Sequence, residues 1–301
     1  MVRTTRKAPD EGKKPVISYY TKDKVYCPVC RKSFEHEDML SGGGRMIAGS
    51  LTDELHRIFE PSARFGPVYP LLYAIGACPV CHTALFWNDF KTLAPDDAKI
   101  ILENEDERKK AVSAVFPYYN LTRNRTLFDG AAMYYLALLT YEKTSAAYSP
   151  TIKKAIIALR LAWLCGDLNA VCPGRNYDYV QQVFYRKAMF FYQQALEYET
   201  GRVESIAGVA NFGPDIDKNY GYDGVVYLCG LLEYKYGQRE DNNLRLKKLD
   251  EYKRAIARIF GLGKSSKNKP GPLLEHSRNL YDSIAKELKD ASDIDIDLDD
   301  D

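Results

Sequence analysis

Four cysteines of the chain occur in two identical Cys-Pro-Val-Cys tetrapeptides, at residues 27–30 and 78–81. Two residues between two thiolates let a single tight turn direct both sulfur atoms at one metal ion. Two such turns supply the four sulfur ligands of a tetrahedral shell, the geometry and donor set that suit zinc. The spacing therefore predicts one Zn²⁺ site whose ligands are Cys27, Cys30, Cys78 and Cys81.

The chemistry expected of this site follows from its ligand count. A catalytic zinc ion keeps one position open for water, whereas four thiolates close the shell. We therefore expect a structural zinc ion that contributes folding free energy. His36 and His82 lie near the two pairs in the sequence, and either could replace a cysteine. Redox use of one pair is a further alternative, but it is typical of a βαβ context that these segments lack.

The two pairs are separated by residues 31–77, a gap much longer than the roughly 15–20 residues of a usual ribbon spacing. We expect this insert to fold around the site. Residues 64–73 are rich in aromatic residues and proline, which indicates either packing beside the metal or a recognition surface. Together these features predict a small zinc-ribbon-like module over residues 19–95.

From about residue 96 the character of the sequence changes, because glycine and proline become rare and apolar residues recur every three to four positions. This periodicity is typical of amphipathic helices. It predicts a mainly α protein with helices near residues 96–116, 126–145, 150–170, 177–200, 222–237, 240–260 and 271–290.

Several of these helices resemble copies of one unit. The tripeptide Leu-Cys-Gly occurs at residues 164–166 and again at 228–230, and small residues there would let a second helix cross closely. Residues 188–195 have the spacing of small and aromatic residues found in the second helix of a tetratricopeptide (TPR) repeat. We therefore predict a TPR-like helical body over residues 96–290, although its spacing departs from the regular period.

The remaining cysteines and the many tyrosines are interpreted within this helical body. Cys165 and Cys229 are expected to be buried packing residues, and Cys172 a free thiol in a loop. The chain has 23 tyrosines. A tyrosine combines a large apolar face with a polar tip, which suits helix packing and equally a peptide-binding groove.

The charge of the chain is balanced overall but uneven along its length. Its 42 basic and 41 acidic residues give a net charge of +1, so no overall excess attracts nucleic acid or membranes. We expect a disordered basic arm at residues 1–18 and a disordered acidic tail at 291–301. The start resembles no secretory signal, and no apolar run reaches the roughly 18 residues of a membrane span, so we expect a cytoplasmic protein.

These motifs resemble those of a bacterial family known only as domain of unknown function 2225. The resemblance rests on the four cysteines, Pro70, Tyr73, Ala84 and the Asp-Phe pair at residues 89–90, and it extends from about Tyr19 to about residue 260. The family usually has Cys-Gly-Tyr-Ala at its last cysteine, whereas this chain has Cys-His-Thr-Ala at residues 81–84. Membership implies a zinc-ribbon-like head and a TPR-like body, and it implies no known reaction.

The sequence contains no nucleophile-elbow or zinc-protease motif, so we expect a protein that is not an enzyme. The first hypothesis is a zinc-stabilised adaptor that binds a protein partner in the groove of its helical repeat. The second is a nucleic-acid-binding protein that uses the zinc module, the basic arm and the basic stretch 239–278. Zinc-dependent hydrolysis is the least favoured, because it needs a cysteine replaced by water.

Overall fold

The computed structural model describes residues 16–261 and 269–299, and the protein is mainly α, as predicted. The helices that follow residue 94 are numbered in chain order. They are α2 (Pro95–Glu103), α3 (Glu105–Val115), α4 (Leu127–Tyr141), α5 (Pro150–Val171), α6 (Tyr177–Thr200), α7 (Gly221–Tyr236), α8 (Asn242–Phe260) and α9 (Gly271–Asp299), with short 3-10 turns η2 (Ala146–Tyr148) and η3 (Ile206–Gly208).

In the described part of the chain, the strands form three separate two-stranded antiparallel sheets. The sheets pair β1 (Ser18–Tyr26) with β2 (Ser33–Met39), β3 (Ile47–Leu51) with β4 (Arg57–Glu60), and β5 (Ile75–Ala77) with β6 (Ala84–Phe86). The 3-10 turn η1 (Pro70–Tyr73) leads into β5, and the short helix α1 (Asp89–Thr92) follows β6. The first and third sheets are the hairpins whose turns contain the cysteine pairs.

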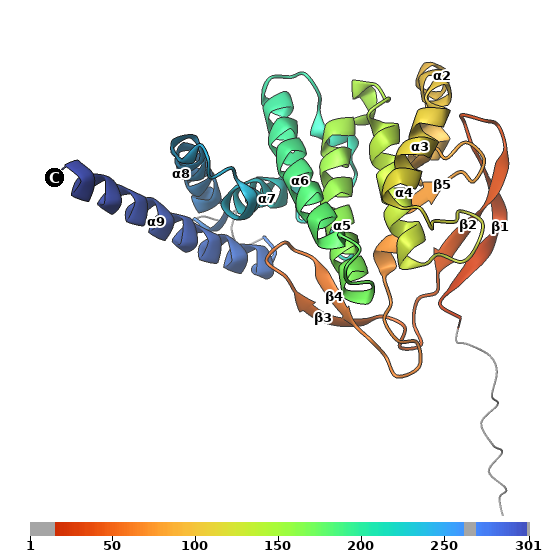
Figure 1. The fold of residues 1–301 in the computed structure, drawn as a ribbon, viewed down its shortest axis with the longest axis horizontal. Coiled ribbons are helices and arrows are strands. Elements are labelled where there is room, and N and C mark those ends of the chain that lie inside the picture. Colours follow the sequence, from red (N-terminus) through yellow and green to blue (C-terminus); the bar gives the residue numbers. More distant parts are fainter. Residues whose placement is uncertain (1–15, 262–268, 300–301) are drawn as a thin grey trace, which may run out of the picture.

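The helices α4 to α8 form a row in which each helix packs against the next (Figure 1). The row begins beside the strand-rich region, where α4 contacts β5 and β6, and ends where α9 packs against α7 and α8. This arrangement of successive helices is compatible with a helical repeat, but a TPR-like repeat remains a prediction.

The predicted helix at 96–116 is two helices in the structure, α2 and α3, which corrects that expectation. Asn104 has φ −99° and ψ 20°, so the helix is interrupted there. Its side-chain amide donates to the Ile100 carbonyl at 2.8 Å, and Arg108 Nη1 donates to the Ile101 carbonyl at 2.9 Å. The carbonyls at the end of α2 are therefore satisfied without a continuous helix.

The core of the molecule is centred on α5, which lies between α4 and α6. This helix is buried along most of its length, including Ile156, Leu159 and Leu164. Cys165 and Cys229 are fully buried, as predicted. The glycines that follow them permit close helix contacts, because a Cβ atom on Gly230 would lie only 2.7 Å from Ile256 Cδ1.

Most of the tyrosines on these helices act in packing. Residues such as Tyr134, Tyr141, Tyr192 and Tyr227 are at most 1% exposed. Several use their hydroxyl groups to reach backbone or side-chain acceptors on other elements, as Tyr134 does by donating to the Leu71 carbonyl at 2.9 Å. The tyrosine surplus therefore serves mainly the core of the helical body.

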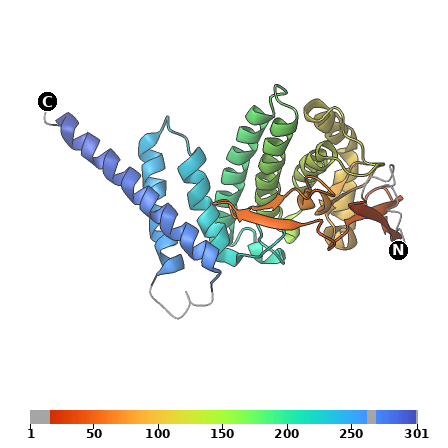
Figure 2. The same cartoon turned by 90° about the horizontal axis from the view of Figure 1, so that it is seen from below.

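The β3–β4 hairpin corrects the expectation that the whole insert folds around the cysteines. It extends along the row of helices toward α7 (Figure 2). Its turn is anchored there, since Trp163 Nε1 on α5 donates to Glu54 Oε2 at 2.6 Å and Tyr227 on α7 donates to the Asp53 carbonyl at 2.7 Å. The insert therefore connects the strand-rich region to distant helices.

The structure departs from the sequence prediction at the C-terminal end and leaves most of the N-terminal prediction untested. Residues 1–15 of the predicted basic arm lie outside the described residues, and Ser18 already begins β1. Residues 291–299 of the predicted acidic tail continue α9 instead of being disordered. Extending an existing helix avoids the cost of nucleation, which sequence composition alone does not reveal. None of the helices in the described residues is both long and apolar enough to cross a membrane.

Candidate metal centre

Each cysteine pair lies in a tight turn at the end of a β-hairpin, and the two turns have the same geometry. In the first, the Cys27 amide donates to the Lys32 carbonyl at 2.9 Å and the Arg31 amide to the Cys27 carbonyl at 3.0 Å. In the second, the Cys78 amide donates to the Thr83 carbonyl at 2.8 Å and the His82 amide to the Cys78 carbonyl at 2.9 Å. The repeated sequence thus produces a repeated local structure.

Neither turn has a glycine after its second cysteine, the position where a left-handed backbone favours glycine. Arg31 and His82 occupy this position, with φ values of 62° and 55°. A left-handed conformation costs a residue with a side chain roughly 1–2 kcal/mol. The two turns are therefore mildly strained, and contacts elsewhere must hold them in place.

The structure brings all four cysteines together. Their sulfur atoms lie within 4.8 Å of one another, with Cys27 Sγ and Cys81 Sγ 3.6 Å apart and Cys30 Sγ and Cys78 Sγ also 3.6 Å apart. Zn–S bonds of about 2.3 Å in a tetrahedron require sulfur atoms roughly 3.8 Å apart. Three of the cysteines are fully buried and Cys30 is half-buried. This cluster could hold a metal ion.

The two histidines that the sequence left open as ligands point to other partners. The His36 ring lies 3.9 Å from the ring centre of Trp87, and His82 Nδ1 lies 3.0 Å from the Tyr119 hydroxyl. Burial lowers the pKa of both imidazoles. Among the described residues, the one group of close metal-binding side chains consists of the four cysteines alone.

The crowded thiols affect one another strongly. Hydrogen bonds from Cys27, Cys78 and Thr83 hold the pKa of Cys81 far below its usual range. The pKa of Cys78 is raised, chiefly because its hydrogen bonds with Cys27 and Cys81 favour the protonated thiol. Metal binding requires thiolates, and a bound cation would compensate the charge of several thiolates held this close together.

Arg108 on α3 supports the second turn, a role that no sequence motif predicted. It is only 3% exposed, and it donates to the carbonyls of Cys81 at 2.7 Å and His82 at 3.1 Å. Burial lowers its pKa, while the neighbouring cysteines act in the opposite direction. A buried guanidinium here both fixes the turn and offsets the negative charge of thiolates. Arginine in a polar helix such as α3 is normally solvent-exposed.

The residues at 89–90 join the metal centre to the helical body. Asp89 Oδ2 accepts a hydrogen bond from Tyr141 of α4 and lies 2.6 Å from Lys153 Nζ of α5. Phe90 packs in the other direction against Phe34 of β2, with ring centres 5.6 Å apart. The family-like Asp-Phe pair is therefore a structural link.

The aromatic and proline-rich stretch before the second turn is also explained by packing. Residues 70–73 are buried, and Leu72 lies against α4 so closely that a Cβ atom on Gly130 would be 2.1 Å from Leu72 Cδ2. Arg125 donates to the Leu72 and Ile75 carbonyls and lies 3.3 Å from the Glu37 carboxylate. Most of this segment therefore holds β5 against the helical body.

Comparison with known families matches residues 20–284 to a family described as an uncharacterized protein conserved in bacteria, DUF2225. The chain belongs to this family. A DUF2225 match of this extent includes the four cysteines and the helices as far as α9. A protein of Borreliella burgdorferi, described only as uncharacterized, is 42% identical over 274 residues, which cover 91% of this chain and 98% of the relative. No solved structure matches the chain.

Proposed function

We propose that this DUF2225 protein is a non-enzymatic, zinc-stabilised adaptor that binds a protein partner through its helical body. The observation that carries the proposal is the four-sulfur cluster, which joins two hairpins distant in sequence. Four thiolates suit zinc and leave no coordination position for water, so the ion would stabilise the fold rather than act on a substrate. Arg108 would balance part of the resulting charge.

The helical surface that supports partner binding is a groove between α6 and α8. It is a cavity of about 570 Å³ whose apolar residues include Met189, Phe190 and Leu244. Phe190 is 54% exposed and Leu244 50% exposed, which is unusual for large apolar side chains beside a cavity. Lys248 and the buried Glu233 lie in the same groove. An apolar peptide segment with a polar side chain would match this surface.

The β3–β4 turn covers another part of the helical surface, on α5 and α6. The β3–β4 turn lies against the aromatic residues Trp163 and Tyr185 and accepts hydrogen bonds from both through Glu54, at 2.6 and 2.9 Å. The adaptor proposal therefore relies on the α6–α8 groove, which no described residue of the insert lines.

The adaptor proposal is tested by combining metal analysis with partner capture. Protein purified in reducing buffer is expected to contain one zinc ion per chain, and a double variant, Phe190→Ser with Leu244→Ser, is expected to lose a partner that the wild type retains. Tyr179→Ser is the matched control, because Tyr179 is a 71% exposed aromatic residue on the same helix α6. Protein without zinc, or equal capture by the double variant, would contradict the proposal.

A second candidate function is nucleic-acid binding by the zinc module. Tyr26 is 71% exposed immediately before Cys27, and Lys24 and Lys32 are exposed nearby. Stacking on an aromatic ring combined with basic residues is typical of single-strand binding. Loss of oligonucleotide binding in Tyr26→Ala with Lys24→Ala, together with a steep salt dependence, would favour this function; flat binding curves at low salt would exclude it.

The basic stretch 239–278 adds little to this second candidate. Residues 262–268 lie outside the described part. Elsewhere in the stretch, Arg245 is buried and 2.5 Å from Glu287, Lys269 lies 2.9 Å from Asp223, and Arg254 lies 2.5 Å from Asp250. Several of its charges are therefore already paired.

A further inference from the structure

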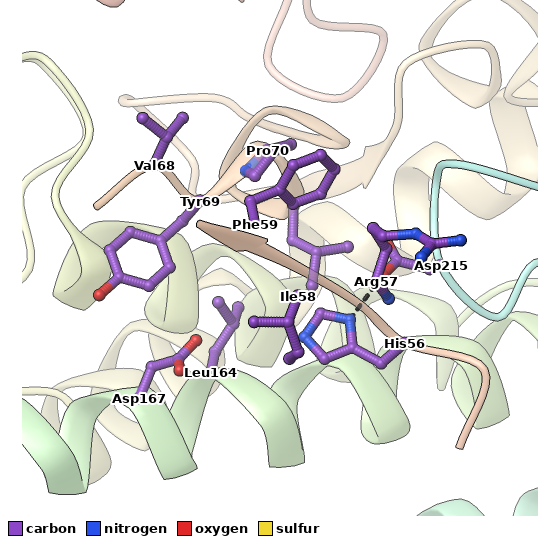
Figure 3. A pocket seen from close by; sticks show the side chains of 11 residues that line it. His56, Arg57, Ile58, Phe59, Val68, Tyr69, Pro70, Leu164, Asp167 and Asp215 are labelled. Atoms are coloured by element: carbon purple, nitrogen blue, oxygen red, sulfur yellow. Dashed lines mark hydrogen bonds and ion pairs between the residues drawn. The ribbon is translucent and has the colours of Figure 1, made fainter. Parts of the chain in front are cut away.

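A cavity of about 450 Å³ lies where the insert meets the helical body (Figure 3). Its walls are largely apolar, with Ile58 and Phe59 from β4, Val68 and Tyr69 from the segment before η1, and Leu164 from α5. Polar groups gather at the side formed by α5 and the start of β4. This combination of apolar walls with a few polar groups is typical of a small-molecule or side-chain binding pocket.

The Asp167 carboxylate enters this cavity from α5. Among the described residues, no side chain or amide forms a hydrogen bond or ion pair with it, in contrast to the half-buried carboxylate of Asp89 and the buried one of Glu54. Burial raises the pKa of Asp167 to about 6, and the charge of His56 only partly opposes this effect. A half-buried carboxylate without a partner is costly in the ionised form, and a cation would remove that cost.

The basic side chains near Asp167 form their hydrogen bonds and ion pairs with other residues. His56 Nδ1 lies 2.5 Å from Asp215 Oδ2, and the imidazole stacks on Trp163 with ring centres 4.1 Å apart. The Arg57 guanidinium lies 3.2 Å from Asp217 and donates to the Gly49 carbonyl at 2.9 Å. Neither basic residue therefore neutralises the Asp167 carboxylate directly.

We propose that this cavity binds an alkylammonium group, with Asp167 as the counter-ion. The apolar walls would cover the alkyl chain, and the Tyr69 ring, which lines the cavity beside Asp167, would contact the bound cation. The ligand would carry a primary ammonium group on a short aliphatic chain. This group could belong to a free amine or to a lysine side chain of a bound protein.

A second cavity makes the carboxylate accessible from another side. It has a volume of about 580 Å³, and it shares Asp167, His56 and Ile58 with the first cavity while extending to Gln181 of α6. The site thus lies between an element of the insert and two helices. A ligand held there would contact both the β3–β4 hairpin and the helical body.

The test is calorimetric titration of the full zinc-loaded chain with n-butylamine, 1,5-diaminopentane and Nα-acetyl-lysine methylamide. Asp167→Asn is expected to weaken amine binding about tenfold or more, because a charge-assisted contact is lost. Glu197→Gln, which changes an exposed carboxylate on α6, is the matched control and should bind as the wild type does. Tyr69→Leu keeps an apolar wall and is expected to weaken binding severalfold.

The probes also separate the two sources of the ammonium group. Preference for the free diamine supports a small-molecule ligand, and preference for the lysine derivative supports a protein partner. Amine binding should strengthen from pH 5 to pH 7, because Asp167 loses its proton in this range. The other titratable groups that line the same cavity are His56, Arg57, Asp215 and Tyr69. Equal binding of n-butanol, or unchanged binding by folded Asp167→Asn protein, would overturn the proposal.

Discussion

The strand-rich region before residue 94 and the helical body after it are stabilised in different ways. In the body, α4 and α5 bury long apolar faces, and residues such as Leu136, Ile157 and Leu159 are fully buried. In the strand-rich region the hairpins have only two strands each, and many of their residues are exposed. A two-stranded sheet is marginally stable by itself. Cys27 and Cys30 lie at the end of the largely exposed β1–β2 hairpin, whereas Cys78 and Cys81 lie at the end of the buried β5–β6 hairpin, so the cluster ties an exposed hairpin to a buried one.

The contacts between the two regions are also unlike those within the body. They include charged residues that are almost fully buried, such as Arg108 on the second cysteine turn and Arg125 beside Glu37. Buried charges demand specific geometry, because each unpaired group would be strongly destabilising. The difference teaches that apolar packing holds the helices of the body together, whereas buried polar contacts between distant residues hold the hairpins against that body.

The largest expected effect is on the metal centre itself. Cys81→Ser, or chelation of the metal, should unfold the two cysteine hairpins while leaving most of the helical signal, because structural zinc contributes about 10 kcal/mol or more. Hydrogen exchange should increase in residues 18–39 and 75–86 and remain slow in α5. Cys172→Ser, which changes the half-buried loop thiol, is the control. Simultaneous loss of α5 protection would show that the two regions fold as one unit.

A smaller effect is expected from replacing Arg108, which connects α3 of the helical body to the second cysteine turn. Arg108→Ala should lower the free energy of unfolding by about 3 kcal/mol, because two buried carbonyls lose a charged donor. It should also speed metal loss to a chelator, measured with a colorimetric zinc indicator. Lys110→Ala changes an exposed residue of the same helix and should have little effect. Normal zinc retention by Arg108→Ala would contradict the proposal that Arg108 supports the second cysteine turn.

The β3–β4 hairpin tests whether the regions are also coupled at a distance. Glu54→Gln should cost about 2 kcal/mol, because it breaks the ion pair with Lys235 at 3.1 Å and replaces the charged acceptor of the Trp163 and Tyr185 hydrogen bonds with a neutral amide. Denaturant unfolding with Trp163 fluorescence measures the change. Asp53→Asn, at a side chain that is 48% exposed, should cost about 0.5 kcal/mol or less. Equal costs would mean that the turn is held by the backbone alone.

The smallest expected effect is a gain in stability. Asp167 has a raised pKa of about 6 in the folded protein, so the folded state binds its proton more tightly than the unfolded state does. Its contribution is therefore favourable at low pH and is lost as the pH rises from about 4 to 6. Asp167→Asn should stabilise the protein by about 1 kcal/mol at pH 7 and change little at pH 4. Thermal unfolding at both pH values measures this, and a loss of stability at pH 7 would contradict it.

Much of the helical body could be predicted because helix formation follows local periodicity. The predicted helices at 150–170 and 177–200 differ from α5 and α6 by at most one residue at an end. The break at Asn104 was not predicted from periodicity, and Arg108, which donates to the Ile101 carbonyl at the end of α2, is held by the carbonyls of Cys81 and His82, which are distant in the chain. Similarly, the path of residues 47–60 is set by hydrogen bonds that Glu54 accepts from side chains of α5, α6 and α7. No local sequence pattern predicts these long-range contacts.

The sequence by itself determined the two cysteine turns, since Cys-Pro-Val-Cys fixes both the donor atoms and their spacing within four residues. Only the tertiary structure decided that the two turns meet, that His36 and His82 face other partners, and that Arg108 lies beneath the second turn. It also decided that Asp167 enters a cavity in which no basic side chain of residues 16–261 or 269–299 pairs with it. The physical reason is that turn geometry and helix periodicity are local, whereas burial and charge pairing depend on residues that are far apart in the chain.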